Sequence, residues 1–173
     1  MNKIALYPGT FDPPTNGHLD LVRRSLRVFS RVIVGIAYNP HKHTLFNPQE
    51  RLEMFREAVK DMSGVEVDIL DGLVIDYAQR HKVNAIIRGM RAVTDFEHEL
   101  QIASVNRQLC PEIETVFMSP SEHYTYLSSS VVREVALFGG PVSEFVPEHI
   151  EKRLREKLAN SSRAKDVNNI TLL

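Results

Sequence analysis

The sequence predicts an α/β fold in which five parallel strands form a doubly wound sheet with helices on both faces. Short apolar segments typical of buried strands alternate five times with longer segments in which apolar residues recur at helical spacing. Such alternation implies βαβ crossovers, which make the strands parallel and bring helices onto both faces of the sheet. With 173 residues, of which 43% are hydrophobic and 25% charged, the chain has the size and composition of one globular domain.

The first three elements are defined by apolar residues and by the residues that interrupt them. A strand covers residues 3–7 and is stopped by Pro8 and Gly9. A helix follows from residue 16 to about residue 29, because its apolar side chains recur every three or four positions. Residues 31–38 are β-branched and almost wholly apolar, as expected for a strand that is covered on both faces.

Capping residues mark the start of two later helices. Asn47 can cap a helix in which Pro48 occupies the first turn and Glu50 completes a capping box. Thr94 with Glu97 repeats the capping-box pattern and begins another helix. The other expected elements are strands at residues 65–70, 84–87 and 115–118 and helices at residues 73–81, 129–138 and 148–158.

The elements form a single Rossmann-like domain that we expect to comprise residues 1–159. In its last helix, Ile150, Leu154 and Leu158 lie on one stripe, which could be core or interface. Residues 160–173 are mostly polar, and we expect them to form a flexible C-terminal tail.

Composition and charge exclude several classes of protein. A formal net charge of −1 counts against a nucleic-acid polymer as the main partner, since such proteins are normally basic. The longest apolar run, residues 32–38, is far short of the roughly 20 residues that cross a bilayer, so no membrane partner is expected. The lone Cys110 excludes an internal disulfide and a multi-cysteine zinc site, and it fits a reducing, cytoplasmic location.

The segment after the first strand has the features of a phosphate site. In a doubly wound sheet, ligands bind beyond the carboxyl ends of the strands. There, Gly17 allows close approach to the backbone, and the helix start offers unpaired N–H groups. His18 adds a ring donor, and Thr10 and Thr15 add hydroxyl donors. The alternative is that Thr15 or Asn16 only caps the helix and that His18 is an ordinary surface side chain.

Three further loops at strand ends carry basic or hydroxyl residues. Lys42 follows the second strand, although a solvated loop lysine is the usual case. Arg88 and Arg91 flank a glycine after the fourth strand and suit an anionic ligand, unless they pair with acidic residues of the next helix. A serine run at residues 128–130 opens a later helix, where it can cap the helix and form a second anion site.

Taken together, these motifs resemble the phosphopantetheine adenylyltransferase family, in the wider group of nucleotidyltransferases that carry a Thr/His-x-Gly-His motif. The matching strings are residues 7–13 and 15–18, the Lys42 loop, residues 88–92 with 95–97, and residues 127–130. Thr-x-Gly-His marks only the wider group, whereas Arg-Gly-x-Arg-Ala followed by Asp-Phe-Glu marks this family. The resemblance covers about residues 2 to 159.

The resemblance implies a reaction and a set of site residues. ATP and 4′-phosphopantetheine would give dephospho-coenzyme A and pyrophosphate by direct in-line attack, without a covalent intermediate. The catalytic residues would be His18, Lys42 and Arg91, and phosphopantetheine would be held by Thr10, Lys42, Val74 and Arg88. ATP would be held by Thr10, Phe11, His18, Gly89, Met90, Arg91, Glu99, Tyr124, Thr125, Tyr126, Leu127, Ser128, Ser129 and Ser130. Mg²⁺ would arrive with ATP, and the chain would form a homo-hexamer.

The chain departs from the family pattern at two places, and two other functions stay open. Val74 stands where the family often carries Leu or Met, so a backbone contact there is expected, and for residues 124–126 only the position is transferred. One alternative is a nucleotidyltransferase that acts on glycerol phosphate or on a nicotinamide nucleotide. The other is an ATP-binding regulatory module without catalysis.

Overall fold

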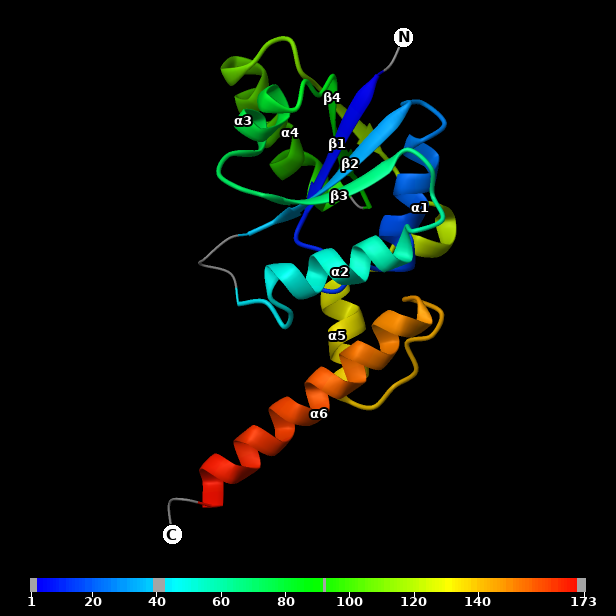
Figure 1. Ribbon diagram of the computed structural model, residues 1–173, viewed down its shortest axis with the longest axis vertical. Helices are drawn as coiled ribbons and strands as arrows, with labels where there is room; N and C mark the ends of the chain where they lie inside the picture. Colours follow the sequence, from blue (N-terminus) through cyan, green and yellow to red (C-terminus); the bar gives the residue numbers. More distant parts are fainter. Residues whose placement is uncertain (1–2, 39–42, 92, 171–173) are drawn as a thin grey trace.

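A five-stranded parallel sheet forms the centre of the molecule (Figure 1). The computed structural model describes residues 3–38, 43–91 and 93–170, except the side chains of residues 93–95 and 161–170. The strands are β1 (Ile4–Gly9), β2 (Arg31–Ala37), β3 (Val65–Leu70), β4 (Ala85–Gly89) and β5 (Glu114–Met118). This arrangement confirms the predicted α/β fold.

The strand order places a crevice at the middle of the sheet. The order is β3-β2-β1-β4-β5, so the chain winds outward from β1 to β3, returns to the centre and then winds outward in the other direction. The order therefore reverses between β1 and β4. In doubly wound sheets the ligand binds outside the carboxyl ends of the strands at this point.

Helices cover both faces of the sheet because the strands are apolar on both. Ala5 and Tyr7 of β1 face the first hydrophobic cluster, which includes apolar residues of α1 (Asn16–Ser25) and α2 (Pro48–Ala58). Leu6 faces the opposite cluster, which includes α3 (Val74–Arg80) and Cys110 at the end of α4 (Val93–Leu109). This alternation along one strand fixes which side of β1 each neighbouring residue occupies.

A third hydrophobic cluster attaches the C-terminal helices to α2. It joins Met54 of α2 to Val132 of α5 (Ser129–Leu137) and to Ile150 and Leu154 of α6 (Glu148–Ile170). Part of the stripe predicted on the last helix is therefore core. In Figure 1, α5 and α6 lie beneath the layer that contains the sheet and α2. Among the described helices, none combines the length and the apolar character needed to cross a membrane.

Three helix boundaries differ from those predicted. The helix α1 ends at Ser25 and not near residue 29, because the chain turns after Ser25. The buried Phe29 fits the apolar spacing of the helix but lies outside it. The helix α4 already begins at Val93, so the expected cap Thr94 lies within the helix. The helix α6 continues to Ile170, well past the expected end at Leu158, because no glycine or proline interrupts that segment.

The cap expected at Asn47 is confirmed. The backbone N–H of Glu50 donates to Asn47 Oδ1 over 2.9 Å, and the N–H of Asn47 donates to Glu50 Oε2 over 2.7 Å. Ser128 likewise caps α5, since the N–H of Val131 donates to its Oγ over 3.2 Å. Both helices thus begin at the residues that the sequence indicates.

Candidate active site

A pocket of about 690 Å³ contains most of the residues that the sequence singled out. Its walls come from the loop after β1, the end of β4, the middle of α4 and the segment before α5. The predicted residues that line it are Thr10, Phe11, His18, Val74, Arg88, Gly89, Arg91, Glu99, Tyr124, Leu127, Ser128, Ser129 and Ser130. Segments that are distant in the sequence therefore meet at one place.

Three other predicted residues, Met90, Thr125 and Tyr126, are not among the described residues that line this pocket. The N–H of Met90 donates to Met118 O over 3.0 Å, which continues the pairing of β4 with β5. Thr125 Oγ1 donates to Glu122 O over 3.0 Å, next to the short 3₁₀ helix at Glu122–Tyr124, and Tyr126 is 90% exposed. Lys42 lies outside the described residues.

His18 and Thr15 form a reciprocal cap at the start of α1. The N–H of Thr15 donates to His18 Nδ1 over 3.0 Å, and the N–H of His18 donates to Thr15 Oγ1 over 3.4 Å. An amide N–H can only donate, so Nδ1 must be the unprotonated ring nitrogen. The proton of the neutral ring therefore resides on Nε2, which is left as a donor on a ring that lines the pocket.

The surroundings of His18 keep its ring neutral. Removal of water from around the ring, together with the positive charge of Arg91, lowers the pKa of His18 to about 4. The ring of Phe11 packs edge-on against the imidazole, with the ring centroids 5.0 Å apart. At neutral pH His18 is thus an uncharged hydrogen-bond donor with a defined tautomer.

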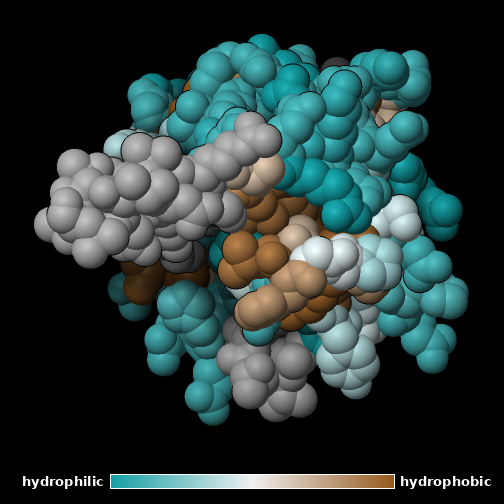
Figure 2. All heavy atoms as spheres, turned by 90° about the horizontal axis from the view of Figure 1, so that it is seen from below, coloured by the Kyte–Doolittle hydropathy of each residue, from teal (hydrophilic) through white to brown (hydrophobic). Residues whose placement is uncertain are grey.

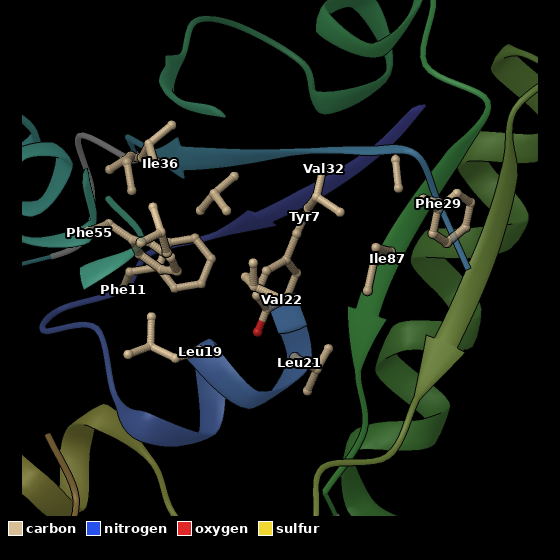
Figure 3. Close-up of a cluster of buried hydrophobic side chains, with 14 of the residues drawn as sticks. Tyr7, Phe11, Leu19, Leu21, Val22, Phe29, Val32, Ile36, Phe55 and Ile87 are labelled. Atoms are coloured by element: carbon tan, nitrogen blue, oxygen red, sulfur yellow. The ribbon is translucent and has the colours of Figure 1, made fainter. Parts of the chain in front are cut away.

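Phe11 holds the loop after β1 against the core (Figure 3). Its side chain is 3% exposed, and its ring centroid lies 5.2 Å from that of Tyr7 and 4.8 Å from that of Phe55. Its φ of 50° lies in the left-handed region, which a non-glycine residue occupies only when its surroundings hold it there. A Cβ on Gly9 would lie 2.6 Å from the Phe11 ring, so glycine is needed at that position.

The two arginines after β4 are both tied to the walls of the pocket. Arg88 makes a two-pronged ion pair with Glu99, with Nε–Oε2 and Nη2–Oε1 distances of 2.5 and 2.7 Å. This is the pairing that the sequence left open as the alternative to ligand binding. Arg91 Nη1 donates to Leu127 O over 3.2 Å and so joins the end of β4 to the segment before α5. Arg88 and Arg91 nevertheless both line the pocket.

Two helix N-termini are directed at the same pocket. Gly17 and His18 in the first turn of α1 and Ser129 and Ser130 in the first turn of α5 line it. Neither first turn, all of whose residues are described, contains an acidic side chain. Because helix N-termini carry unpaired N–H groups and a partial positive charge, they favour bound anions such as phosphate. Ser129 Oγ donates to Pro13 O over 2.8 Å, which links the two helix starts.

Asp12 is a site residue that sequence reasoning missed. Its buried carboxylate accepts hydrogen bonds from the N–H groups of Leu45 and Phe46, each over 2.9 Å. It also pairs with Arg133 of α5, with Oδ2 and Nη1 3.2 Å apart. Asp12 and Arg133 both line the pocket. Asp12 stands among turn residues, so the sequence offered only a signal for a turn.

The described residues contain no cluster that could hold a metal ion by itself. No group of three or more His, Cys, Asp or Glu side chains has the required arrangement among them. His43 lines the pocket but brings no such partners with it.

Comparisons with known proteins show the family of this chain. A family profile described as cytidylyltransferase-like matches residues 6–135. The phosphopantetheine adenylyltransferase of Desulfosudis oleivorans is 50% identical, over 95% of this chain and 99% of that protein. The one from Methylococcus capsulatus is 53% identical, over 93% of this chain and 99% of that protein. The chain belongs to the phosphopantetheine adenylyltransferase family.

A solved structure supports the fold of this chain. The crystal structure of a putative nicotinate-nucleotide adenylyltransferase from Vibrio parahaemolyticus superposes with a TM-score of 0.64. The match covers 92% of this chain and 93% of that one at 19% identity, so it is evidence for the fold alone. Membership of the family makes the chain a nucleotidyltransferase of coenzyme A synthesis.

The state of the His18 ring can be tested directly. Nitrogen NMR of the labelled protein should show His18 with a proton on Nε2 and none on Nδ1 from pH 8 down to about pH 5, because its pKa is about 4. A ring that is protonated at pH 6 would contradict this assignment.

The same pKa has a consequence for stability. Between the ordinary value of 6.5 and about 4, the unfolded chain binds a proton at His18 that the folded chain does not bind. The free energy of unfolding should therefore fall as the pH falls through this window. Urea denaturation at several pH values should show a smaller fall for a His18→Asn variant.

Proposed function

We propose that the chain transfers the adenylyl group of ATP to 4′-phosphopantetheine, giving dephospho-coenzyme A and pyrophosphate, the penultimate step of coenzyme A synthesis. The convergence of two helix N-termini and a neutral His18 donor on one pocket carries this proposal. Three phosphates of ATP and one of the acceptor need such a collection of donors. The adenylyltransferases at about 50% identity support the choice of both substrates.

In the proposed mechanism the acceptor phosphate attacks ATP directly. One of its oxygens forms a bond to the α-phosphorus while the bond from that phosphorus to the bridging oxygen of pyrophosphate breaks, and pyrophosphate leaves with the electron pair. The Nε2–H of His18 donates to an oxygen of the transferring group, where charge builds up. Lys42 and Arg91 add positive charge. The hydroxyls of Ser128 and Ser129 serve as a helix cap and as a bond to Pro13 O, so neither is used as a nucleophile.

The proposal assigns a set of residues to each substrate, and Thr10 belongs to both sets. Phosphopantetheine is held by Thr10, Lys42 and Arg88, with Val74 beside its pantetheine arm. ATP is held by the following residues: Thr10, Phe11, His18, Gly89, Met90, Arg91, Glu99, Tyr124, Thr125, Tyr126, Leu127, Ser128, Ser129 and Ser130. Mg²⁺ is carried by the triphosphate oxygens of ATP, and the enzyme works in the cytoplasm, where Cys110 stays reduced.

We further propose that the chain assembles as a homo-hexamer. Large apolar side chains are exposed along α4 and α5, at Leu100, Val105, Leu109, Val131, Leu137 and Phe138. Figure 2 shows hydrophobic residues gathered on one face of the molecule and bordered by hydrophilic ones. Exposed apolar surface of this kind is typical of an interface. Sedimentation velocity should give a six-chain species, and a monomer would reject the assembly.

The proposed reaction can be tested with the purified chain. Incubation with ATP, Mg²⁺ and phosphopantetheine should yield dephospho-coenzyme A and pyrophosphate, which mass spectrometry and a coupled pyrophosphate assay detect. Parallel incubations should contain glycerol phosphate or nicotinamide mononucleotide as acceptor, with ATP or CTP. A product only in those incubations would replace the proposed acceptor, and ATP binding without any product would indicate a regulatory module.

The role of His18 in catalysis can be separated from its role as a helix cap. In His18→Asn the amide oxygen takes the position of Nδ1 and keeps the cap, but the donor at Nε2 is lost. We expect kcat to fall by roughly 10²- to 10³-fold, the effect of losing one oriented donor to the transition state. The KM for ATP should change much less. His18→Gln, whose amide nitrogen reaches the position of Nε2, should recover part of the rate; full turnover in His18→Asn would reject the mechanism.

The role of Arg88 must be separated from that of its partner Glu99. Arg88→Ala should raise the KM for phosphopantetheine more than the KM for ATP, because a cation near the acceptor phosphate is lost and the carboxylate of Glu99 loses its partner. In the double variant with Glu99→Gln that negative charge is gone. Steady-state kinetics should then show partial recovery of the KM for phosphopantetheine. An equal rise in both KM values for Arg88→Ala would reject the assignment.

A further inference from the structure

Arg51 of α2 is a buried cation that binds three separate segments of the backbone. Its side chain is 1% exposed. Nη1 donates to Thr10 O over 2.5 Å and to Ala37 O over 2.9 Å, and Nε donates to Phe46 O over 3.1 Å. These carbonyls belong to the loop after β1, to the end of β2 and to the residue before the cap of α2. One guanidinium group thus holds together segments that come from three places in the sequence.

Asp12 holds the same region from the other side. Phe46 is bound through its C=O by Arg51 and through its N–H by the Asp12 carboxylate. Asp12 also binds the N–H of Leu45 and pairs with Arg133 of α5. Two buried groups of opposite charge therefore fix the backbone at residues 45–46, directly after His43 and Thr44, which line the pocket.

Packing alone does not explain a charged residue at this position. Removing a guanidinium from water is energetically unfavourable, and its partners here are carbonyls rather than a directly bonded carboxylate. Burial lowers the pKa of Arg51, while the nearby Asp12 carboxylate raises it. An apolar side chain would fill the space without this cost, but it could not hold three carbonyls in fixed positions.

We propose that Arg51 is a positioning residue that sets the spacing of the loops forming one wall of the pocket. This inference rests on the proposed function, in which that wall, through Thr10, holds phosphopantetheine and makes one of the many contacts to ATP. Thr10 and Ala37, whose carbonyls Arg51 binds, both line the pocket. The opposite side, with His18 and Arg91, has no hydrogen bond to Arg51 among the described contacts. Arg51 should therefore act mainly on the acceptor.

Arg51→Lys is the variant that tests this proposal, and Arg56→Lys is its matched control. Lysine keeps the charge and the long stem, but its single ammonium group cannot reproduce the planar fork of arginine. Arg56 lies on the same helix, but it is exposed, and its Nε and Nη2 both donate to one carbonyl, Val67 O of the edge strand β3. Neither Arg56 nor Val67 lines the active-site pocket.

Steady-state kinetics below the melting temperature give the first measurement. For Arg51→Lys we expect a rise of roughly tenfold in the KM for phosphopantetheine, because a shift of about 1 Å in a binding group can reduce activity up to about 10²-fold. The KM for ATP should change by less than about threefold, since most of the residues proposed to hold ATP have no described hydrogen bond to Arg51. Arg56→Lys should keep both KM values. Unchanged KM values in Arg51→Lys, or an equal rise in both, would overturn the proposal.

Amide hydrogen exchange gives a second measurement that needs no turnover. Exchange at residues 10–12 and 43–46 should be faster in Arg51→Lys than in Arg56→Lys, because the hydrogen bonds that hold these segments are lost. If the wild-type chain makes no dephospho-coenzyme A, the proposed function fails, and exchange still decides whether Arg51 holds the loops. Arg51 and Asp12, which both bind the backbone of Phe46, form a clamp on these loops. If Arg51→Lys does not fold, Asp12→Asn weakens this clamp, and it must show the same faster exchange at residues 10–12 and 43–46. Wild-type exchange in these segments would overturn the proposal.

Discussion

The reciprocal hydrogen bonds between Thr15 and His18 connect the fold of this enzyme to its chemistry. They satisfy backbone donors at the start of α1, which would otherwise be unpaired. Because Thr15 N–H donates to Nδ1, the same contact also decides which ring nitrogen of His18 carries the proton. The contact that begins the helix thus also prepares the donor at the centre of the pocket.

The site is basic although the chain is almost neutral. The formal net charge is −1, yet the pocket is lined by Arg88, Arg91 and Arg133 and by two helix N-termini. Asp12 and Glu99, which also line it, are each paired with one of these arginines. The pairs hold the arginines in defined positions, and the helix starts add donors that carry no full charge. An average over the whole sequence conceals this local arrangement.

The accuracy of the sequence predictions follows from the range of the interactions involved. The strand at Val65–Leu70 and the cap at Asn47 are confirmed, because both depend on residues that are neighbours in the chain. The end of α1 was misplaced because Phe29 keeps the apolar spacing while lying outside the helix. The family motif predicted many of the residues that line the pocket, but it did not reveal that Arg88 is paired with Glu99 or that the side chain of Phe11 is buried.

The sequence by itself determined the order of strands and helices, the helix starts that can bind phosphate, and the family with its reaction. These depend on local periodicity, on capping residues and on short motifs, all of which can be read along the chain. Only the tertiary structure decided the proton position on His18 and the clamp formed by Arg51 and Asp12. The proton position follows from the distance between the N–H of Thr15 and Nδ1 of His18. In the clamp, one buried group, Arg51, joins Thr10, Ala37 and Phe46. No pattern in the sequence contains those distances.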